Sequence, residues 1–526
     1  MMRLLAGIDV GTTHVKVGLF DERGSCVAAV GRATPRDLPG LVAAVTDALG
    51  ECAGRAGRGP EAIGIAGMAE TGVPLDASGR PLTPLLWWND PRGADEAAGL
   101  GRDAPALYAL TGRWADAKAP LAKWLWLRAH SPEVLASMRW WASVPDAVAY
   151  ALTGSLRTHA TLAARTLAYD VARGDYDGDL LALAGLSADR LPPTAGAVEP
   201  VGPLTAPVRG VRPGVPVVIA GHDHAVGAWA AGVRRPGDVA DSLGTAEAVM
   251  APAAGRPDPR TGLALGMTAD PSLDGARTVL VGALPTSGAL LDWLLGLLAP
   301  GDTADTARPD VPASGVPRPD GPAPGACRRD ASASGAVGPD GSGPGAVGHD
   351  LEAALPPRRR PGGYAALPGL LAGVRLPTGI VVEPYLRGRV APAPDRDRRL
   401  ALSGLDAGHE PGDLLAAAIE GTCLHARWIL DELTALAGAA PGRLAVFGGQ
   451  VRIPLWMRVK AAVSPVPVEV VLADDTVCAG AALIAGQAGG SLDDVPVLPR
   501  EHLPPDPALR AAYLPQYERF LARGRA

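Results

Sequence analysis

The stretch Leu4–Gly24, LLAGIDVGTTHVKVGLFDERG, is the starting point for interpreting this chain. Two alternating apolar runs, Leu4–Val10 and Val15–Phe20, flank a Gly-Thr-Thr-His segment, which predicts a strand, a tight turn and a second strand. Asp9 ends the first strand. A glycine turn with threonine hydroxyls can hold a phosphate, and a carboxylate beside it suits the Mg²⁺ that accompanies the phosphate. The alternative interpretation is an ordinary hairpin with a surface aspartate.

Length and composition limit the class of protein. The chain has 526 residues, more than one typical core, so we expect two domains. It is 47% hydrophobic and 20% charged, which is ordinary for a globular protein. The formal net charge of −6 argues against a nucleic-acid partner, because no basic field would attract phosphodiesters.

Cysteine usage and apolar run lengths bear on the compartment. The five cysteines are scattered and form no CxxC pair, so we expect neither a metal cluster nor a disulfide framework, and a reducing cytoplasm is the simplest location. The first residues lack the long apolar core of a signal peptide. The longest apolar runs are interrupted well before the length of a membrane span, so no membrane partner is expected.

Spacing of apolar residues predicts the other elements. Asp37–Cys52 and Pro411–Leu436 have helical spacing, and Ala104–Ala149 is predicted to be mostly helical. Ala62–Ala66 and Gly379–Leu386 are predicted strands. The segment at 300–361 differs in kind, because Gly, Pro, Ala, Asp and Arg dominate it, and we interpret it as a low-complexity insertion without chemistry.

A pair of tryptophans precedes a polar cluster. Trp87 and Trp88 are followed by Asn89 and Asp90. In a strand the two rings would point to opposite faces, so one could be buried and the other could face a cleft. Aromatic rings stack on sugars while amide and carboxylate groups bind sugar hydroxyls, which favours a sugar site; two packing tryptophans at a strand end remain the alternative.

Asp223 lies where active-site residues are common in open α/β sheets. The continuous apolar run Val215–Ala220 predicts a buried strand, and small residues after Asp223 predict a closely packed helix. The alternative role for this aspartate is a helix N-cap. His222 and His224 flank it, but no third metal ligand is near them in sequence.

The second half of the chain repeats part of the opening pattern. Within Val239–Met250, the segment Ser242–Thr245 is a second strand–Gly-Thr–strand unit, comparable with Asp9–Thr12. Two such turns could hold a polyphosphate from two sides of a cleft. Gly448 and Gly449 follow another predicted strand, where a nucleotide can meet backbone. Neither a P-loop nor a GxGxxG motif is present, which disfavours those nucleotide folds.

Taken together, the motifs resemble the FGGY carbohydrate kinases. The motifs that carry the resemblance, in order along the chain, are GIDVGTTHVKVGLFD, LLWWNDPR, IAGHDHAVGA, DSLGTAEAV, PYLRGRVAP and AVFGGQVRIPLWMRVKAAV. The resemblance spans about 5 to 490, the insertion excluded. It implies an α/β protein with the two-domain actin/hexokinase-like (ribonuclease H-like) fold and an interdomain catalytic cleft. The expected domains are 1–240 and 241–500, followed by a tail at 501–526.

The resemblance also implies roles for individual residues. Asp223 matches the catalytic base and Asp9 the residue that holds Mg²⁺. The positions that match contacts with the phosphates or the nucleotide of ATP are Gly11, Thr12, Thr13, Gly244, Thr245, Gly288, Gly448 and Gly449. The positions that match contacts with the sugar or polyol are Glu70, Thr71, Trp88, Asn89 and Asp90.

The implied activity is transfer of the γ-phosphate of ATP to a hydroxyl of a sugar or polyol. A xylulose-like ketose is favoured, and homodimer formation is left open. Departures from the family pattern at His14, Arg389 and Gln450 leave the substrate unnamed. The alternative function is a weak or inactive sugar-sensing relative of the same fold. Retention of Asp9, both phosphate turns and Asp223 argues against lost chemistry.

Overall fold

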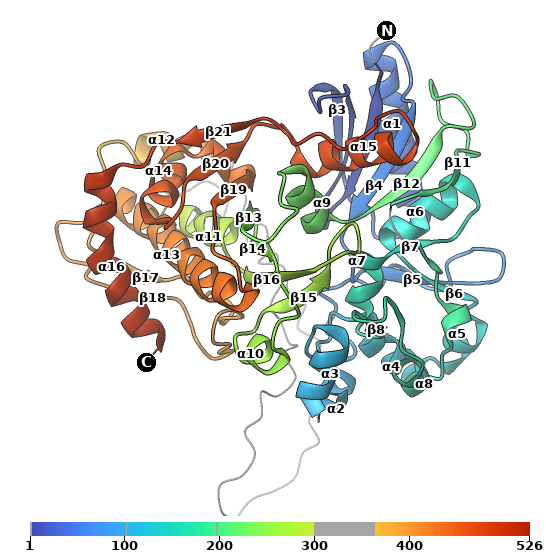
Figure 1. Ribbon diagram of the computed structural model, residues 1–526, viewed down its shortest axis with the longest axis horizontal. Coiled ribbons are helices and arrows are strands. Elements are labelled where there is room, and N and C mark those ends of the chain that lie inside the picture. The colour runs from blue at the N-terminus through green and yellow to red at the C-terminus, as the bar shows by residue number, and fades with distance from the viewer. Residues whose placement is uncertain (1–2, 101–102, 196–197, 299–362, 526) are drawn as a thin grey trace, which may run out of the picture.

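The computed structural model describes residues 3–100, 103–195, 198–298 and 363–525. The predicted insertion at 300–361 lies outside these residues. Two mixed β-sheets form the centres of two lobes (Figure 1). In the described residues no helix has both the length and the apolar character needed to cross a membrane.

The first sheet has the strand order β11-β12-β4-β1-β2-β3. Its hairpin β1–β2 is the predicted opening motif, and β1 runs parallel to β4, which runs parallel to β12. Asp9 and Val10 therefore reach the same sheet edge as Gly67 and His222. The strands are β1 (Leu5–Val10), β2 (His14–Phe20), β3 (Cys26–Ala33), β4 (Ala62–Gly67), β11 (Pro200–Pro203) and β12 (Pro216–His222).

The second sheet repeats this plan in the order β15-β16-β14-β13-β19-β20-β21. An antiparallel hairpin β13–β14 is again followed by strands β19 and β20 that run parallel to its first strand. The repeat explains why two similar glycine turns occur in one chain. The strands are β13 (Asp238–Leu243), β14 (Glu247–Pro252), β15 (Thr268–Pro271), β16 (Thr278–Leu284), β19 (Arg443–Gly448), β20 (Val468–Val471) and β21 (Arg500–Leu503).

Helices cover both faces of each sheet. The outer face of the first sheet packs on α1 (Leu38–Ala56) and α6 (Val144–Thr153). Asp37 caps α1 by accepting a hydrogen bond from the Gly40 amide at 2.8 Å, as a helix N-terminus requires. The outer face of the second sheet packs on the long helix α13 (Pro411–Ala437) and its neighbours. These are α11 (Gly288–Leu298), α14 (Pro454–Val463) and α16 (Pro507–Arg525).

Two helices lie between the sheets. One buried cluster joins Val218 of the first sheet and Ala445 of the second to side chains of α9 (Asp223–Ala230) and α15 (Thr476–Ala488). Figure 1 shows α15, drawn in orange-red, beside the blue strands of the opposite lobe. The inner faces of the two sheets therefore share one core.

The remaining elements extend the first lobe and cover the second. The stretch Ala104–Ala149 is mostly helical, as predicted, but it also contains the loop 112–119 and β6 (Trp140–Ser143), which pairs with β5 (Gly72–Leu75) and was not predicted. The predicted strand Gly379–Leu386 is shorter, since only β17 (Val381–Glu383) pairs with β18 (Ala401–Ser403). The other helices and strands are α2 (Ala94–Leu100), α3 (Ala104–Thr111), α4 (Pro120–His130), α5 (Pro132–Ser137), α7 (Ala160–Ala163), α8 (Gly178–Leu183), α10 (Pro259–Ala264), α12 (Gly363–Leu370), β7 (Thr158–His159), β8 (Tyr169–Asp170), β9 (Asp175–Tyr176) and β10 (Thr194–Ala195), with short 3-10 turns η2 (Ala164–Thr166), η3 (Ala188–Arg190) and η4 (Gly449–Arg452).

Glycines in two strands allow α15 to touch the first sheet through backbone atoms. A Cβ atom placed on Gly7 would lie 1.7 Å from the Cys478 carbonyl oxygen, and one on Gly64 would lie 1.9 Å from the Ala481 carbonyl oxygen. No side chain fits at these distances, so larger residues there would push the helix away.

We expect Gly64→Ala to destabilise the protein by about 3 kcal/mol, because the added methyl group overpacks the β4–α15 contact. This corresponds to a fall of roughly 6 °C or more in the thermal midpoint. Gly31→Ala is the control, since a Cβ atom there meets nothing within 4 Å. Calorimetry on both variants checks the prediction, and equal midpoints would contradict it.

Candidate active site

Asp9 lies in an acidic setting at the end of β1. Its side chain is buried, and Oδ1 has no hydrogen-bond partner. Burial raises the pKa of Asp9 well above its usual value, and the neighbouring carboxylates of Asp475 and Asp223 raise it further. A divalent cation in contact with this oxygen would satisfy it and favour the ionised form.

Lys16, in β2, links the β1–β2 hairpin to α15. Its Nζ donates to Asp475 Oδ2 at 2.8 Å and lies 3.8 Å from Asp9 Oδ2. Asp475 is also the N-cap of α15, where its side chain accepts from the Cys478 amide. Burial opposes the charge on Lys16, but Asp475 and Asp9 outweigh it and raise the lysine pKa. The ammonium group therefore holds residues from both halves of the chain together.

The β1–β2 turn is fixed by the backbone and by one threonine. The Gly11 amide donates to the His14 carbonyl at 3.1 Å, and Thr34 donates its hydroxyl to the Gly11 carbonyl at 2.8 Å. The Thr34 amide donates to the Thr13 carbonyl. These bonds order the turn while Thr13 stays exposed.

Asp223 begins α9 directly after β12, as the sequence predicts. Its Oδ1 accepts the His224 amide at 2.6 Å and lies 3.1 Å from His222 Nε2. Burial opposes ionisation of Asp223, but His222 and His224, the His224 amide and the Arg165 guanidinium together lower its pKa. An aspartate with a lowered pKa is ionised at neutral pH and can accept a proton.

His222 connects Asp223 to Arg165. Arg165 Nη2 lies 3.4 Å from His222 Nδ1. Burial, followed by the Arg165 charge, lowers the pKa of His222 well below its usual value, so the imidazole is neutral. Arg165 Nη2 also lies 3.3 Å from His222 Nε2, and that ring nitrogen lies 3.1 Å from Asp223 Oδ1. His222 is thus packed between the guanidinium group and the carboxylate.

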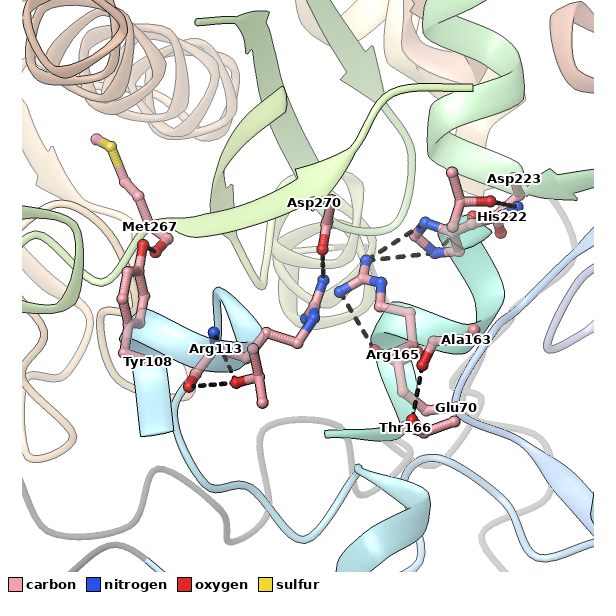
Figure 2. Close-up of polar contacts among 12 residues, drawn as sticks. Glu70, Tyr108, Arg113, Ala163, Arg165, Thr166, His222, Asp223, Met267 and Asp270 are labelled. Atoms are coloured by element: carbon pink, nitrogen blue, oxygen red, sulfur yellow. Dashed lines mark hydrogen bonds and ion pairs between the residues drawn. The ribbon is translucent and has the colours of Figure 1, made fainter. Parts of the chain in front are cut away.

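Figure 2 shows a chain of charged side chains that continues from this histidine. Arg165 lies in η2, and its Nη1 atom is 3.3 Å from Glu70 Oε1. Arg113 follows α3 and donates to Asp270 of β15. Burial opposes ionisation of Glu70, but Arg165 and then Arg113 lower its pKa. The Nε atoms of both arginines are buried without a hydrogen-bond partner, so each can donate to an acceptor on a ligand.

The same region joins the two lobes. Besides the Arg113–Asp270 ion pair, Tyr108 donates its hydroxyl to the Met267 carbonyl, and the Ala269 amide donates to the Gly112 carbonyl at 2.9 Å. The loop after α3 and strand β15 are therefore held together, and the charged side chains come from both lobes.

One tryptophan of the pair is buried and the other is partly exposed, although neither lies in a strand. Trp87 is buried and Arg36 lies over its ring at 4.3 Å, whereas Trp88 is partly exposed. Trp88 donates from Nε1 to Thr12 Oγ1 at 2.9 Å and from its amide to Thr71 Oγ1 at 3.0 Å. The predicted sugar motif thus contacts the predicted phosphate turn directly.

Other residues of the predicted sugar motif lie in different settings. Thr71 is fully buried, and its hydroxyl oxygen accepts the Trp88 amide, which fixes the backbone at Trp88. Asp90 accepts from Arg92, whose hydrogen bond lowers the pKa of Asp90 against the effect of burial. Asn89 is partly exposed in the turn between Trp87 and Asp90, which the Asp90 amide closes by donating to the Trp87 carbonyl.

Three predicted nucleotide segments lie in contact. The Gly288 amide donates to the Gly244 carbonyl at 3.1 Å, and the Ser287 amide donates to the Thr245 carbonyl at 3.0 Å. A Cβ atom on Gly448 would lie 2.1 Å from the Leu243 carbonyl oxygen, whereas one on Gly449 would meet nothing within 4 Å. Gly449 is therefore open to a ligand, while Gly448 permits close packing.

Both halves of the chain are similar to one known family. Residues 4–230 match the N-terminal domain and residues 239–489 match the C-terminal domain of the FGGY family of carbohydrate kinases. The chain belongs to this family. It is an ATP-dependent carbohydrate kinase, and the resemblance read from the sequence motifs is confirmed.

Several characterised FGGY kinases resemble this one over their whole length. The xylulose kinase of Escherichia coli is 27% identical over 98% of this chain and 97% of its own, and the glycerol kinase of Gloeobacter violaceus is 27% identical over 93% and 89%. The solved xylulose kinase of Rhodospirillum rubrum superposes with a TM-score of 0.76 at 26% identity, covering 99% of this chain and 98% of its own. The predicted fold is thereby confirmed.

Sequence reasoning missed five charged residues of this FGGY kinase: Lys16, Arg113, Arg165, Asp270 and Asp475. Lys16 could have been found, because it is the only charged side chain in its strand. Arg165 lies in the stretch 158–170, which has no clear periodicity, and its partner Glu70 is far away in sequence. Asp9 and Asp223, by contrast, lie at the end and at the start of predicted elements.

We expect Arg165→Met to destabilise this kinase by about 3 kcal/mol, because it leaves the Glu70 carboxylate buried without its partner. Adding Glu70→Gln should recover part of the loss. Arg157→Met is the control, because the Arg157–Glu199 pair at 3.0 Å is exposed and should contribute less than about 1 kcal/mol. Thermal unfolding of the three variants checks this, and similar losses at both pairs would contradict it.

Proposed function

We propose that this kinase transfers the γ-phosphoryl group of ATP to a hydroxyl of a small sugar or polyol, with Asp223 as the general base. The observation that carries the proposal is the placement of Asp223 at the start of α9. Its carboxylate accepts the His224 amide, lies beside His222 and is close enough to Asp9 for their charges to interact, and its lowered pKa favours the ionised form. A carboxylate so placed can take the hydroxyl proton as the alcohol attacks phosphorus.

The two glycine turns are suited to hold the phosphates. The β1–β2 turn carries Gly11, Thr12 and Thr13, and the β13–β14 turn carries Gly244 and Thr245. Phosphoryl transfer depends mainly on positioning and on neutralising charge, so ordered backbone amides and hydroxyls do most of what is needed. Lys16, next to the first turn, adds a positive charge that suits the transferred group.

Asp9 fits a Mg²⁺ ion. Its buried Oδ1 lacks a protein donor, and the surrounding ligands are carboxylates, which are the oxygen donors that Mg²⁺ prefers. In the described residues, no group of three His, Cys, Asp or Glu side chains forms a complete site. A cation held by Asp9, phosphates and water matches that donor set. When bound, Mg²⁺ would neutralise the charge on the phosphates.

The sugar would lie among Glu70, Trp88 and the two arginines. The ring of Trp88 can stack on the sugar, and its Nε1 donates a hydrogen bond to Thr12 of the β1–β2 turn. The sugar would therefore lie beside that turn. The free Nε donors of Arg113 and Arg165 can bind substrate hydroxyl oxygens. A xylulose-like ketose is the first candidate substrate, because relatives named xylulose kinase match this chain from end to end. Asn89 and Asp90 would contribute further hydroxyl contacts.

The first test is ADP formation from ATP and Mg²⁺ with a panel of ketoses, polyols and aldonates, together with Asp223→Asn. We expect one substrate class to stimulate turnover, and the variant to lose about 10²–10⁴-fold in kcat while still binding ATP. Asp179→Asn is the control, since that carboxylate is exposed at the start of α8. ATP binding without stimulation by any sugar would favour the sugar-sensing alternative.

A second test concerns the metal. Asp9→Asn should raise the Mg²⁺ concentration needed for half-maximal activity by about tenfold or more, since the amide keeps the shape but removes the charge. Direct Mg²⁺ titration of the ATP complex by calorimetry gives a readout independent of turnover. Unchanged Mg²⁺ dependence in both measurements would contradict the role of Asp9.

A further inference from the structure

A buried charged cluster lies beside the second glycine turn. Lys460, on α14, donates from Nζ to Asp241 Oδ2 at 2.7 Å and also to Glu247 Oε1. Glu247 Oε2 accepts the Ser287 hydroxyl at 3.0 Å. The lysine side chain is 2% exposed and both carboxylates are fully buried. Burying three charged groups is costly unless their arrangement serves a purpose.

The cluster has one carboxyl group on each of the two strands that flank the turn. Leu243 pairs with Glu247 and Asp241 pairs with Val249, so Asp241 and Glu247 lie on the same face of the hairpin, on the two sides of Gly244–Ala246. Lys460 joins them across that face. The ammonium group thereby fixes how β13 and β14 lie relative to each other where the turn begins and ends.

The cluster also reaches the other two nucleotide segments. Through Ser287, Glu247 is tied to the start of α11, whose Ser287, Gly288 and Ala289 amides donate to the turn carbonyls. Through Lys460, the cluster is tied to α14, which follows Gly448 and Gly449. A single set of side chains thus connects all three segments that border the nucleotide.

We infer that Lys460, Asp241, Glu247 and Ser287 are positioning residues that hold the β13–β14 turn in the conformation that binds the phosphates of ATP. This inference rests on the proposed role of Gly244 and Thr245. The cluster does not touch the substrate in any step. It sets the direction of the turn amides. Loss of the lysine would leave two buried carboxyl groups without their cation at that place.

The test compares kinetic constants of conservative variants. Ser287→Ala removes one hydroxyl, and Glu247→Gln replaces the carboxyl group by an amide of the same size. We expect each to raise KM for ATP or to lower kcat, with kcat/KM for ATP falling about tenfold, the size of one lost hydrogen bond to a charged group. KM for the sugar should change by less than about twofold. Lys460→Met should be more severe, and Lys460→Arg should recover part of the loss.

Glu420→Gln is the matched control. Glu420 is a fully buried carboxyl group of the same lobe, bonded to Thr378, Tyr513 and Gln516. It should lower thermal stability without changing KM for ATP. If Ser287→Ala and Glu247→Gln behave like this control, the cluster is only structural and the inference is wrong.

Thr245→Ala separates this inference from the proposed function. A raised KM for ATP in Thr245→Ala with no change in the cluster variants overturns the inference and leaves the function intact. No change in Thr245→Ala overturns the phosphate role of the turn, and the inference with it. Binding of MgADP to each variant by calorimetry gives the same comparison without turnover, so Lys460→Met is informative even if it is inactive.

Discussion

The contact of α15 with β1 and β4 sets the arrangement of the whole molecule. Helix α15 approaches these strands so closely that only glycine fits at Gly7 and Gly64. The same helix packs on α9, and both lie between the sheets. Because α9 begins at Asp223 and α15 is capped by Asp475, this one packing arrangement brings both carboxylates toward Asp9.

Charged side chains then link the lobes at the site. Lys16 joins the first hairpin to α15, and Arg113 joins the loop after α3 to β15. Arg113 and Arg165, whose side chains are largely buried, each have a carboxylate partner from a distant part of the chain, which is how a folded protein tolerates buried charge. The orientation of Asp223 depends on the same set of contacts, through Arg165 and His222.

Features that depend on residues close together in the sequence could be predicted from local sequence patterns. Asp9 and Asp223 were found because each follows a buried strand and adjoins a glycine or small residues. Strand β6 was missed because helices surround it in sequence and its pairing with β5 is a tertiary contact. Arg113 and Arg165 were missed for a related reason, since each ion pair joins residues that only the complete fold brings together. The aligned turns at Gly11 and Gly244 were predictable because the two sheets repeat one strand plan.

The place of α15 in the chain has a consequence for synthesis on the ribosome. The first sheet begins at Leu5, but a helix that covers its inner face ends at Ala488. Until that helix emerges, apolar side chains on strands such as β4 stay without part of their cover, and nascent chains with uncovered apolar surface are prone to aggregate. Completion of the N-terminal lobe therefore waits until α15 has been translated.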